Sequence, residues 1–279
     1  MLPSRMHEVL EQPGYQTRGI KGKSQFLELM AGAVRSAYGG VPIKSLAPQI
    51  PYPNIGVGYA IQETNTRLWL EQGRQIVGRK VAYASQQIRE NSHISDAQTV
   101  FGMLFDNVLK SNGAVINSAE LTQPQVAAEL GFRVAQDVTT IPRDKAAVLK
   151  LLDVSMPLLE VSSNRILDEN KKIIDVVADN ASAGLCVLGE ESEIPSLQRI
   201  ETIEVEILRD GDCVSSHRGS VDVCAALTRL FVKMIAWGRP VRAGDIIASG
   251  AFLPSVPGSA GHVYEGRFSG LGSVWARFS

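Results

Sequence analysis

Hydrophobic residues recur at helical spacing near the start of the chain. Ser24 is a suitable helix cap, and the apolar positions that follow form a single stripe: Phe26, Leu27, Met30, Val34 and Ala37. The pair Gly39-Gly40 ends this pattern. The next segment, 41–56, carries four prolines and predicts a surface connection. A second helix is expected from about Val57 to Gln72.

Shorter apolar runs then predict strands, first from Ile76 to Val81 and later from Val126 to Val134. In the second run the even positions are apolar, and the odd positions include Glu129. Because alternate side chains of a strand face opposite sides, Glu129 is expected on the face away from the apolar stripe. A short helix is expected over Arg143 to Leu152.

The second half of the chain reads mostly as strands. Ile203, Val205 and Ile207 alternate with glutamates before a turn at 210–212, and a hairpin is expected from His262 to Phe278. One helix interrupts them, with Ser220 as its expected cap and an apolar stripe that continues to Trp237.

Composition and charge exclude several classes of function. The 28 basic and 29 acidic residues give a net charge of −1, so no overall field attracts nucleic acid or an anionic membrane. Three scattered cysteines do not make a disulfide framework or a zinc site. No apolar run approaches a membrane span, and the N-terminus lacks the pattern of a secretion signal. These features lead us to expect a soluble, cytoplasmic protein.

Several segments could carry chemistry. Lys80 lies between apolar residues of a short strand, where a lysine at a sheet edge usually extends its charge to solvent. Glu160 follows two leucines, and burying its charge without a partner would be costly. Its partner could be Arg165 or a divalent cation. By contrast, Glu204 and Glu206 alternate with apolar residues and indicate a solvated strand face.

Three motifs together resemble one known family. They are Gly78-Arg79-Lys80-Val81, the stretch Gln123 to Glu129, and the run of small and polar residues Ala178-Asp179-Asn180-Ala181-Ser182. From about Tyr59 to Phe278 the chain resembles the 2-oxopent-4-enoate hydratase and 4-oxalocrotonate decarboxylase family of the fumarylacetoacetate hydrolase superfamily. The resemblance implies a mixed α/β fold of curled β-sheets with a helical N-terminal part. It divides the chain into a lead-in, 1–56, and a hydratase-like domain, 57–279.

The resemblance also implies a lyase that acts on a 2-oxo or 2-hydroxydienoate acid with help from Mg²⁺ or Mn²⁺. Lys80, Glu129 and Glu160 are the expected catalytic residues, and the two glutamates are the expected metal ligands. Groups that could bind the substrate are Ser85, Arg165, Asn180, Ser182 and Ser249. The expected partners are a small-molecule 2-oxo acid and further copies of the chain, since members of this family are generally oligomeric.

The chain departs from the family pattern at several positions. The first carboxylate of the family's Glu-x-Glu motif is replaced by Ala127, an acidic residue before Phe101-Gly102 is replaced by Val100, and an arginine is replaced by Gln125. Two alternatives therefore stay open. One is a metal-independent isomerase, dehydratase or cyclase of a specialised pathway, and the other is a non-catalytic partner subunit.

Overall fold

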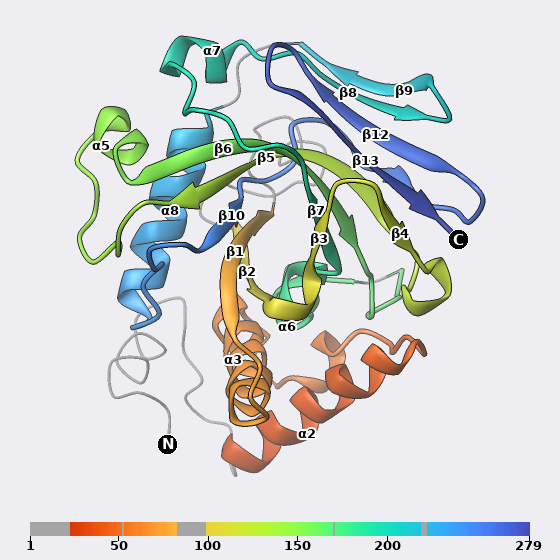
Figure 1. Cartoon of the computed structure of the whole chain (residues 1–279). Coiled ribbons are helices and arrows are strands. Elements are labelled where there is room, and N and C mark those ends of the chain that lie inside the picture. The colour runs from red at the N-terminus through yellow and green to blue at the C-terminus, as the bar shows by residue number, and fades with distance from the viewer. Residues whose placement is uncertain (1–22, 52, 83–98, 170, 219–221) are drawn as a thin grey trace.

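The structure is a computed structural model that describes residues 23–51, 53–82, 99–169, 171–218 and 222–279 (Figure 1). Within these ranges two β-sheets are present, and helices pack against the larger one. The α-helices are α2 Lys23–Ser36, α3 Ile55–Glu71, α5 Lys145–Leu149, α6 Ile173–Ala178, α7 Leu197–Glu201 and α8 Val223–Ala236. Short 3-10 helices are η1 Ala37–Gly39, η2 Ala47–Gln49, η4 Asp106–Val108, η5 Ser118–Glu120 and η6 Asn180–Ser182.

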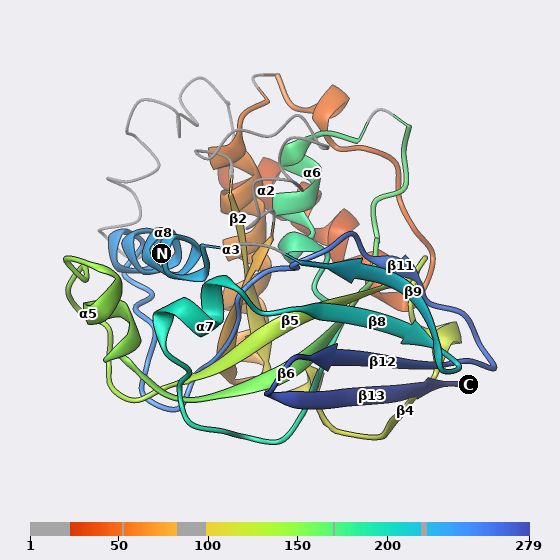
Figure 2. The same cartoon turned by 90° about the horizontal axis from the view of Figure 1, so that it is seen from above.

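The larger sheet has eight strands and runs in the order β2-β1-β10-β5-β6-β7-β3, with β11 paired to β5. Its strands are β1 Ile76–Ala82, β2 Val100–Phe105, β3 Leu109–Ser111, β5 Gln125–Val134, β6 Leu152–Ser162, β7 Leu185–Leu188, β10 Ile246–Ala248 and β11 Val256–Pro257. The pairs β1–β10 and β3–β7 are parallel, and the other pairs of this sheet are antiparallel. The sheet curls, so that β2 and β3 approach the helical side of the molecule (Figures 1 and 2).

The smaller sheet has five strands in the order β4-β13-β12-β8-β9. They are β4 Ala114–Ile116, β8 Val205–Arg209, β9 Asp212–His217, β12 Val263–Phe268 and β13 Gly272–Phe278. The expected turn at 210–212 joins β8 to β9, and the expected C-terminal hairpin is β12–β13, so both predictions are confirmed. This sheet packs across β5 and β6 (Figure 2).

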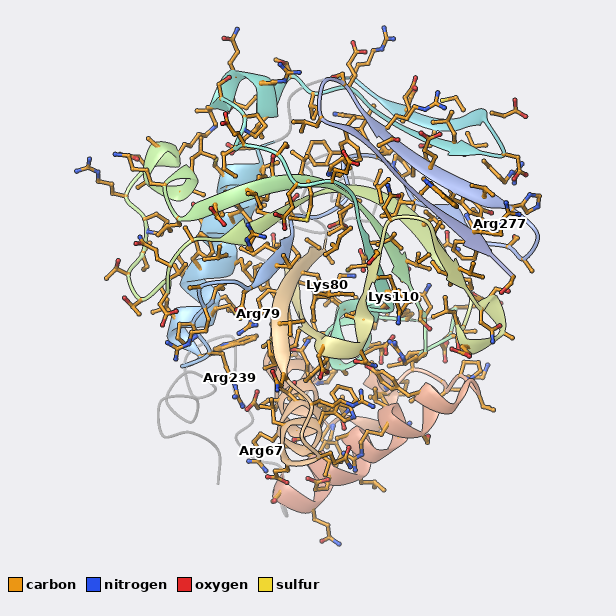
Figure 3. The ribbon with its side chains drawn as sticks, in the orientation of Figure 1. Arg67, Arg79, Lys80, Lys110, Arg239 and Arg277 are labelled. Atoms are coloured by element: carbon orange, nitrogen blue, oxygen red, sulfur yellow. The ribbon has the colours of Figure 1, made fainter. Side chains whose placement is uncertain are left out.

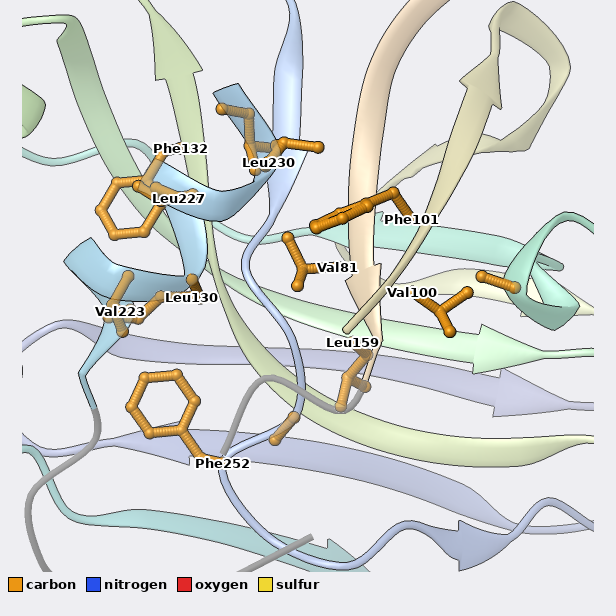
Figure 4. Close-up of a cluster of buried hydrophobic side chains, with 14 of the residues drawn as sticks. Val81, Val100, Phe101, Leu130, Phe132, Leu159, Val223, Leu227, Leu230 and Phe252 are labelled. Carbon is orange, nitrogen blue, oxygen red and sulfur yellow. The ribbon is translucent and has the colours of Figure 1, made fainter. Parts of the chain in front are cut away.

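The main hydrophobic core lies on one face of the larger sheet. The even positions of β5 from Val126 to Val134 are all buried in it, as the alternation predicts. Helix α8 contributes its expected stripe, and Figure 4 shows Leu227 and Leu230 beside Leu130 and Phe132 of β5. Phe231 and Trp237 of this helical region are fully buried, so they belong to the core and are not available for a subunit interface.

A second core joins the N-terminal helices to the rest of the fold. Helix α2 packs on α3, and α3 packs on α6 through residues such as Val57, Ile61 and Ile174. Helix α3 begins two residues earlier than expected because the side chain of Asn54 accepts a hydrogen bond from the Val57 amide. The proposed boundary at 56/57 falls inside the first turn of α3.

Three sequence predictions are wrong in detail. The proline-rich segment 41–56 is not a simple surface connection, because Leu46 and Ile50 are buried and Ser45 Oγ donates to Asp175 Oδ2 at 2.8 Å. The helix expected over 143–152 is shorter, since Asp144 caps α5 and Leu152 already begins β6. Ser220 lies outside the described residues, and the observed cap of α8 is Asp222.

The strand β2 was not anticipated from the sequence, although all six of its residues are buried. Both faces of this strand are covered, so its side chains are uniformly apolar apart from Gly102 and lack the alternation that marks a half-exposed strand. No helix among the described residues is long and apolar enough to cross a membrane.

Candidate active site

Three strands of the larger sheet place Lys80, Glu129 and Glu160 around one point. Lys80 comes from β1, Glu129 from β5 and Glu160 from β6. In the antiparallel register Ala127 lies opposite Glu160, and Glu129 lies opposite Leu158. Because side chains two residues apart share a face, positions 127, 129 and 160 point to the same side of the sheet. This is the face away from the main core, as expected for Glu129.

Lys80 is buried and carries two hydrogen bonds from its Nζ atom. One goes to Glu160 Oε1, and the other goes to the carbonyl oxygen of Ala181 at 2.8 Å. Strand β1 lies between β2 and β10, and only 2% of Lys80 is exposed, so the lysine does not extend from a sheet edge to solvent. Figure 3 shows Lys80 near the middle of the molecule, inside the curl of the sheet.

The charge on Lys80 is maintained by its neighbours. Burial by itself disfavours the ammonium ion, but the Glu160 and Glu129 carboxylates outweigh burial and raise the pKa of Lys80 above its usual value. The lysine therefore stays positively charged and can stabilise negative charge that develops close to it.

Glu129 is also buried and accepts a hydrogen bond from the Gly250 amide at 2.9 Å. Burial and the adjacent Glu160 carboxylate raise the pKa of Glu129 well above its usual value, although Lys80 acts in the opposite direction. Glu129 therefore takes up a proton more readily than an exposed glutamate does.

The Ala181 carbonyl reaches Lys80 because of an unusual backbone segment. Asn180, Ala181 and Ser182 of η6 all have φ values between 52° and 55°, in the left-handed region that residues other than glycine seldom adopt. The Asn180 side chain fixes the segment by donating to Met103 O and accepting from Met103 N, at 2.9 and 2.7 Å. Ser182 Oγ donates to Asp179 Oδ2 at 3.2 Å. Such backbone strain is concentrated at functional sites.

Arg165 is not the partner of Glu160, so the first of the two partners left open by the sequence is excluded. Its guanidinium forms an ion pair with Asp179 at 3.0 Å and donates to the Ala183 carbonyl at 2.6 Å. It also stacks on Tyr38, with 3.7 Å between the guanidinium carbon and the ring centroid. Arg165 and Asn180 line a second pocket, of about 260 Å³.

A cavity of about 360 Å³ opens beside the three charged residues. Lys80, Glu129, Glu160 and Ser182 all line it, so the structure brings together four of the residues that the sequence singled out. Residues that sequence reasoning did not assign to the site also line it: Gln125, Ser162, Asn164, Lys171, Pro254 and Ser255. Ser162 and Asn164 could have been found from the strand period, since they follow Glu160 at intervals of two residues.

Ser249 and Ser85 are the last two residues that the sequence predicts to bind the substrate. Ser249 is 1% exposed, and its Oγ has no hydrogen-bond partner among the described residues. It immediately precedes Gly250, whose amide binds Glu129. Ser85 lies outside the described residues. Glu204 is exposed while Val205 and Ile207 are buried, which confirms the solvated strand face expected for Glu204 and Glu206.

Few side chains at this site could act as ligands of a metal ion. Among the described residues no group of three or more His, Cys, Asp or Glu side chains is arranged to hold a metal ion. Glu129 and Glu160 nevertheless provide two hard oxygen donors that face one cavity, and Ala127 leaves space next to them. Mg²⁺ in proteins is often held by one or two carboxylates, with substrate and water in its other positions. The residues present therefore fit a weakly held, substrate-assisted divalent cation.

The curled mixed sheet and its buried lysine–carboxylate site define an α/β enzyme of the fumarylacetoacetate-hydrolase-like class. Residues 74–279 match the model of the fumarylacetoacetate (FAA) hydrolase C-terminal family. The chain is 35% identical to a 2-keto-4-pentenoate hydratase from Paraburkholderia xenovorans, over 86% of this chain and 89% of the relative. It is 34% identical to a TodF product hydratase from Pseudomonas putida, over 90% and 93% of the two chains. The chain belongs to the fumarylacetoacetate hydrolase family.

Solved structures agree with this fold. The 4-oxalocrotonate decarboxylase from Pseudomonas putida, complexed with magnesium and adipate, superimposes with a TM-score of 0.84 and 23% identity. The match covers 92% of this chain and 98% of that one. A fumarylpyruvate hydrolase from Pseudomonas aeruginosa in complex with Mn²⁺ and pyruvate gives a TM-score of 0.55, with 11% identity over 74% and 88% of the two chains. The mixed α/β fold of curled sheets is thus confirmed.

Proposed function

We propose that the protein is a lyase of the hydratase or decarboxylase type that acts on a 2-oxo or 2-hydroxydienoate acid. The observation that carries this proposal is the buried cluster of Lys80, Glu129 and Glu160 at the wall of a cavity. It combines a lysine whose pKa is raised by two adjacent carboxylates with a buried glutamate whose pKa is raised well above its usual value, chiefly by burial. The hydratase relatives share about a third of their residues with this chain over nearly their whole length.

Glu129 and Glu160 are the residues that would hold a divalent cation, Mg²⁺ or Mn²⁺. When bound, such a cation supplies Lewis-acid stabilisation of the substrate's carboxylate and 2-oxygen. The metal-containing neighbours support a divalent ion of this kind.

The chain's own residues account for the proton transfers. Lys80 places an ammonium group where the 2-oxygen becomes negatively charged, and the dry surroundings strengthen that attraction. Glu129 exchanges a proton with the substrate, which converts the dienol into its conjugated keto form. Glu160 holds Lys80 in position and balances its charge. Addition of water or loss of CO₂ would then complete the reaction.

The direct test is turnover of 2-hydroxypenta-2,4-dienoate, followed by the loss of dienol absorbance with added Mg²⁺ or with a chelator. Loss of absorbance that requires the metal supports the lyase proposal. A stable dienol signal at micromolar enzyme under both conditions would contradict it for this substrate class and would favour a non-catalytic partner subunit.

A second candidate is a metal-independent isomerase, dehydratase or cyclase. The observation that favours it is Ala127, which removes one carboxylate and leaves Lys80 directly bound to Glu160. A lysine paired with a carboxylate, next to a glutamate whose pKa is raised by burial, can carry out acid–base chemistry without a metal. Full turnover in the presence of the chelator would support a metal-independent enzyme.

The Ala127→Glu variant is expected to bind Mg²⁺ at least about tenfold more tightly than the wild type, because it restores a third carboxylate opposite Glu160. Calorimetric titration should show weak binding to the wild type that tightens when oxalate is present. The Ala127→Gln variant has a side chain of similar size without the charge and should not tighten the binding. Equally tight binding by all three proteins would show that these residues are not the ligands.

We also expect the chain to form a homo-oligomer in the cytoplasm. Family resemblance supports this expectation, and exposed apolar residues such as Leu29, Val41 and Val115 offer surface for it. Light scattering at micromolar concentration measures the mass, and a clean monomer would contradict the prediction.

The division at 56/57 also stays a proposal, since α2 and α3 pack together across it.

A further inference from the structure

Lys171 is a second cation at the wall of the cavity that holds Lys80. It lies two residues before α6 and lines the cavity together with Asn164 and Ser162. Its Nζ atom donates to Asn164 Oδ1 at 3.3 Å. No carboxylate of the described residues forms an ion pair with it, whereas Lys80 is paired with Glu160.

The surroundings of Lys171 leave its charge poorly compensated. Burial lowers the pKa of Lys171, and the more distant Asp179 and Asp175 only partly offset that effect. Asp179 is already bound to Arg165, and Asp175 accepts hydrogen bonds from Ser45 and Leu46. An ammonium group that is largely withdrawn from water gains most from an anion that enters the cavity.

Lys171 is bound to Asn164, a residue that lies beyond the end of the strand that carries Glu160. Ser162 is two residues beyond Glu160 on the same face of β6, roughly 7 Å along the strand. Asn164, which accepts from Lys171, follows after two more residues. Gln125 lies opposite Ser162 in the register, so polar side chains line the path between the two cations. A linear substrate held at Lys80 would extend along this path toward Lys171.

We propose that Lys171, together with Asn164, is a specificity-determining site that binds a second carboxylate at the far end of a short, linear dicarboxylic substrate. The proposal rests on the proposed function in one respect, because it assigns the 2-oxo acid end of the substrate to Lys80, Glu129 and Glu160. A substrate without the distal carboxylate leaves the Lys171 ammonium without an anionic partner.

Binding of two unreactive ligands tests the proposal independently of turnover. 2-Oxoadipate and 2-oxohexanoate have the same chain length and differ only in the distal carboxylate. Calorimetry on the wild type should show at least about a tenfold preference for 2-oxoadipate, as expected for one charged hydrogen bond in a partly buried site. Lys171→Met should abolish this preference by weakening only 2-oxoadipate binding.

Lys172→Met is the matched control, since Lys172 is adjacent but exposed, and this variant should keep the wild-type preference. Lys171→Gln keeps a polar side chain and provides a second test if the methionine variant unfolds. Equal affinities of the wild type for both ligands, or an equal loss of both in the Lys171 variants, would overturn the proposal.

The binding and turnover measurements together distinguish failure of the Lys171 proposal from failure of the lyase proposal. If the wild type prefers 2-oxoadipate but turns over neither a mono- nor a dicarboxylic dienol, the lyase proposal fails and the Lys171 site stands. If the dienols are consumed without a Lys171-dependent difference in KM between them, the lyase proposal stands and the Lys171 site fails.

Discussion

Lys80→Met should lower the turnover of a 2-hydroxydienoate substrate about a hundredfold, which corresponds to roughly 3 kcal/mol of lost transition-state stabilisation. Lys80 is the buried cation that faces the reacting end of the cavity, and its charge is held by Glu160 and Glu129. Methionine has a similar length but no charge, so the loss would fall on kcat more than on KM. Steady-state kinetics measured well below the melting temperature provide the test.

The same substitution also affects folding, because it leaves the Glu160 carboxylate buried without its cation. Removal of one partner of a buried ion pair typically costs about 3 kcal/mol of stability. The double variant Lys80→Met/Glu160→Gln removes both charges and should recover much of this stability, as measured by denaturant unfolding. Because Glu160 is itself an expected catalytic residue, the double variant reports on stability, and the catalytic role of Lys80 is measured from kcat of the folded Lys80→Met single variant.

Lys110→Met, a change at an exposed lysine of β3, is the matched control and should leave both turnover and stability unchanged. Unchanged turnover in Lys80→Met would place the lysine outside the chemistry. Recovery of turnover in the double variant would show that Lys80 acts only on the fold.

Gly102→Ala should lower the free energy of unfolding by about 2 kcal/mol or more and should also impair turnover. A Cβ atom at this position would lie 2.5 Å from the Asn180 carbonyl oxygen and 3.1 Å from Lys80 Cγ. The backbone of η6 cannot easily retreat, because the Asn180 side chain is bound to Met103 on the same strand. The variant therefore displaces the segment that carries the Ala181 carbonyl, and Lys80 with it.

Gly39→Ala is a suitable control, because a Cβ atom there would have no neighbour within 4 Å. Its unfolding midpoint should match that of the wild type, and turnover should be normal. A wild-type midpoint for Gly102→Ala would mean that η6 can move without cost, and the close approach would then not position Lys80.

The sequence by itself determined which side of the strand 126–134 carries Glu129. The alternation in 126–134 put Glu129 on the side away from the core, and the structure confirms it. Spacing of the apolar residues also located α2, α3 and α8, because amphipathic helices must bury one stripe. Motifs placed Lys80, Glu160 and Ser182 in one site, and they line one cavity. The sequence analysis did not predict strand β2, because a strand buried on both faces shows no alternation of apolar and polar residues.

Only the tertiary structure decided which charges meet. Arg165 is five residues from Glu160 in the sequence, yet it pairs with Asp179, while Glu160 binds Lys80 from a strand eighty residues away. Lys171 resembles its exposed neighbour Lys172 in the sequence and differs from it only because it faces the cavity. The spacing of apolar residues along a segment shows which side of a helix or strand is buried, because that spacing involves only residues close together in the chain. The partner of a buried charge depends on strand order and register, which are set by contacts between distant segments.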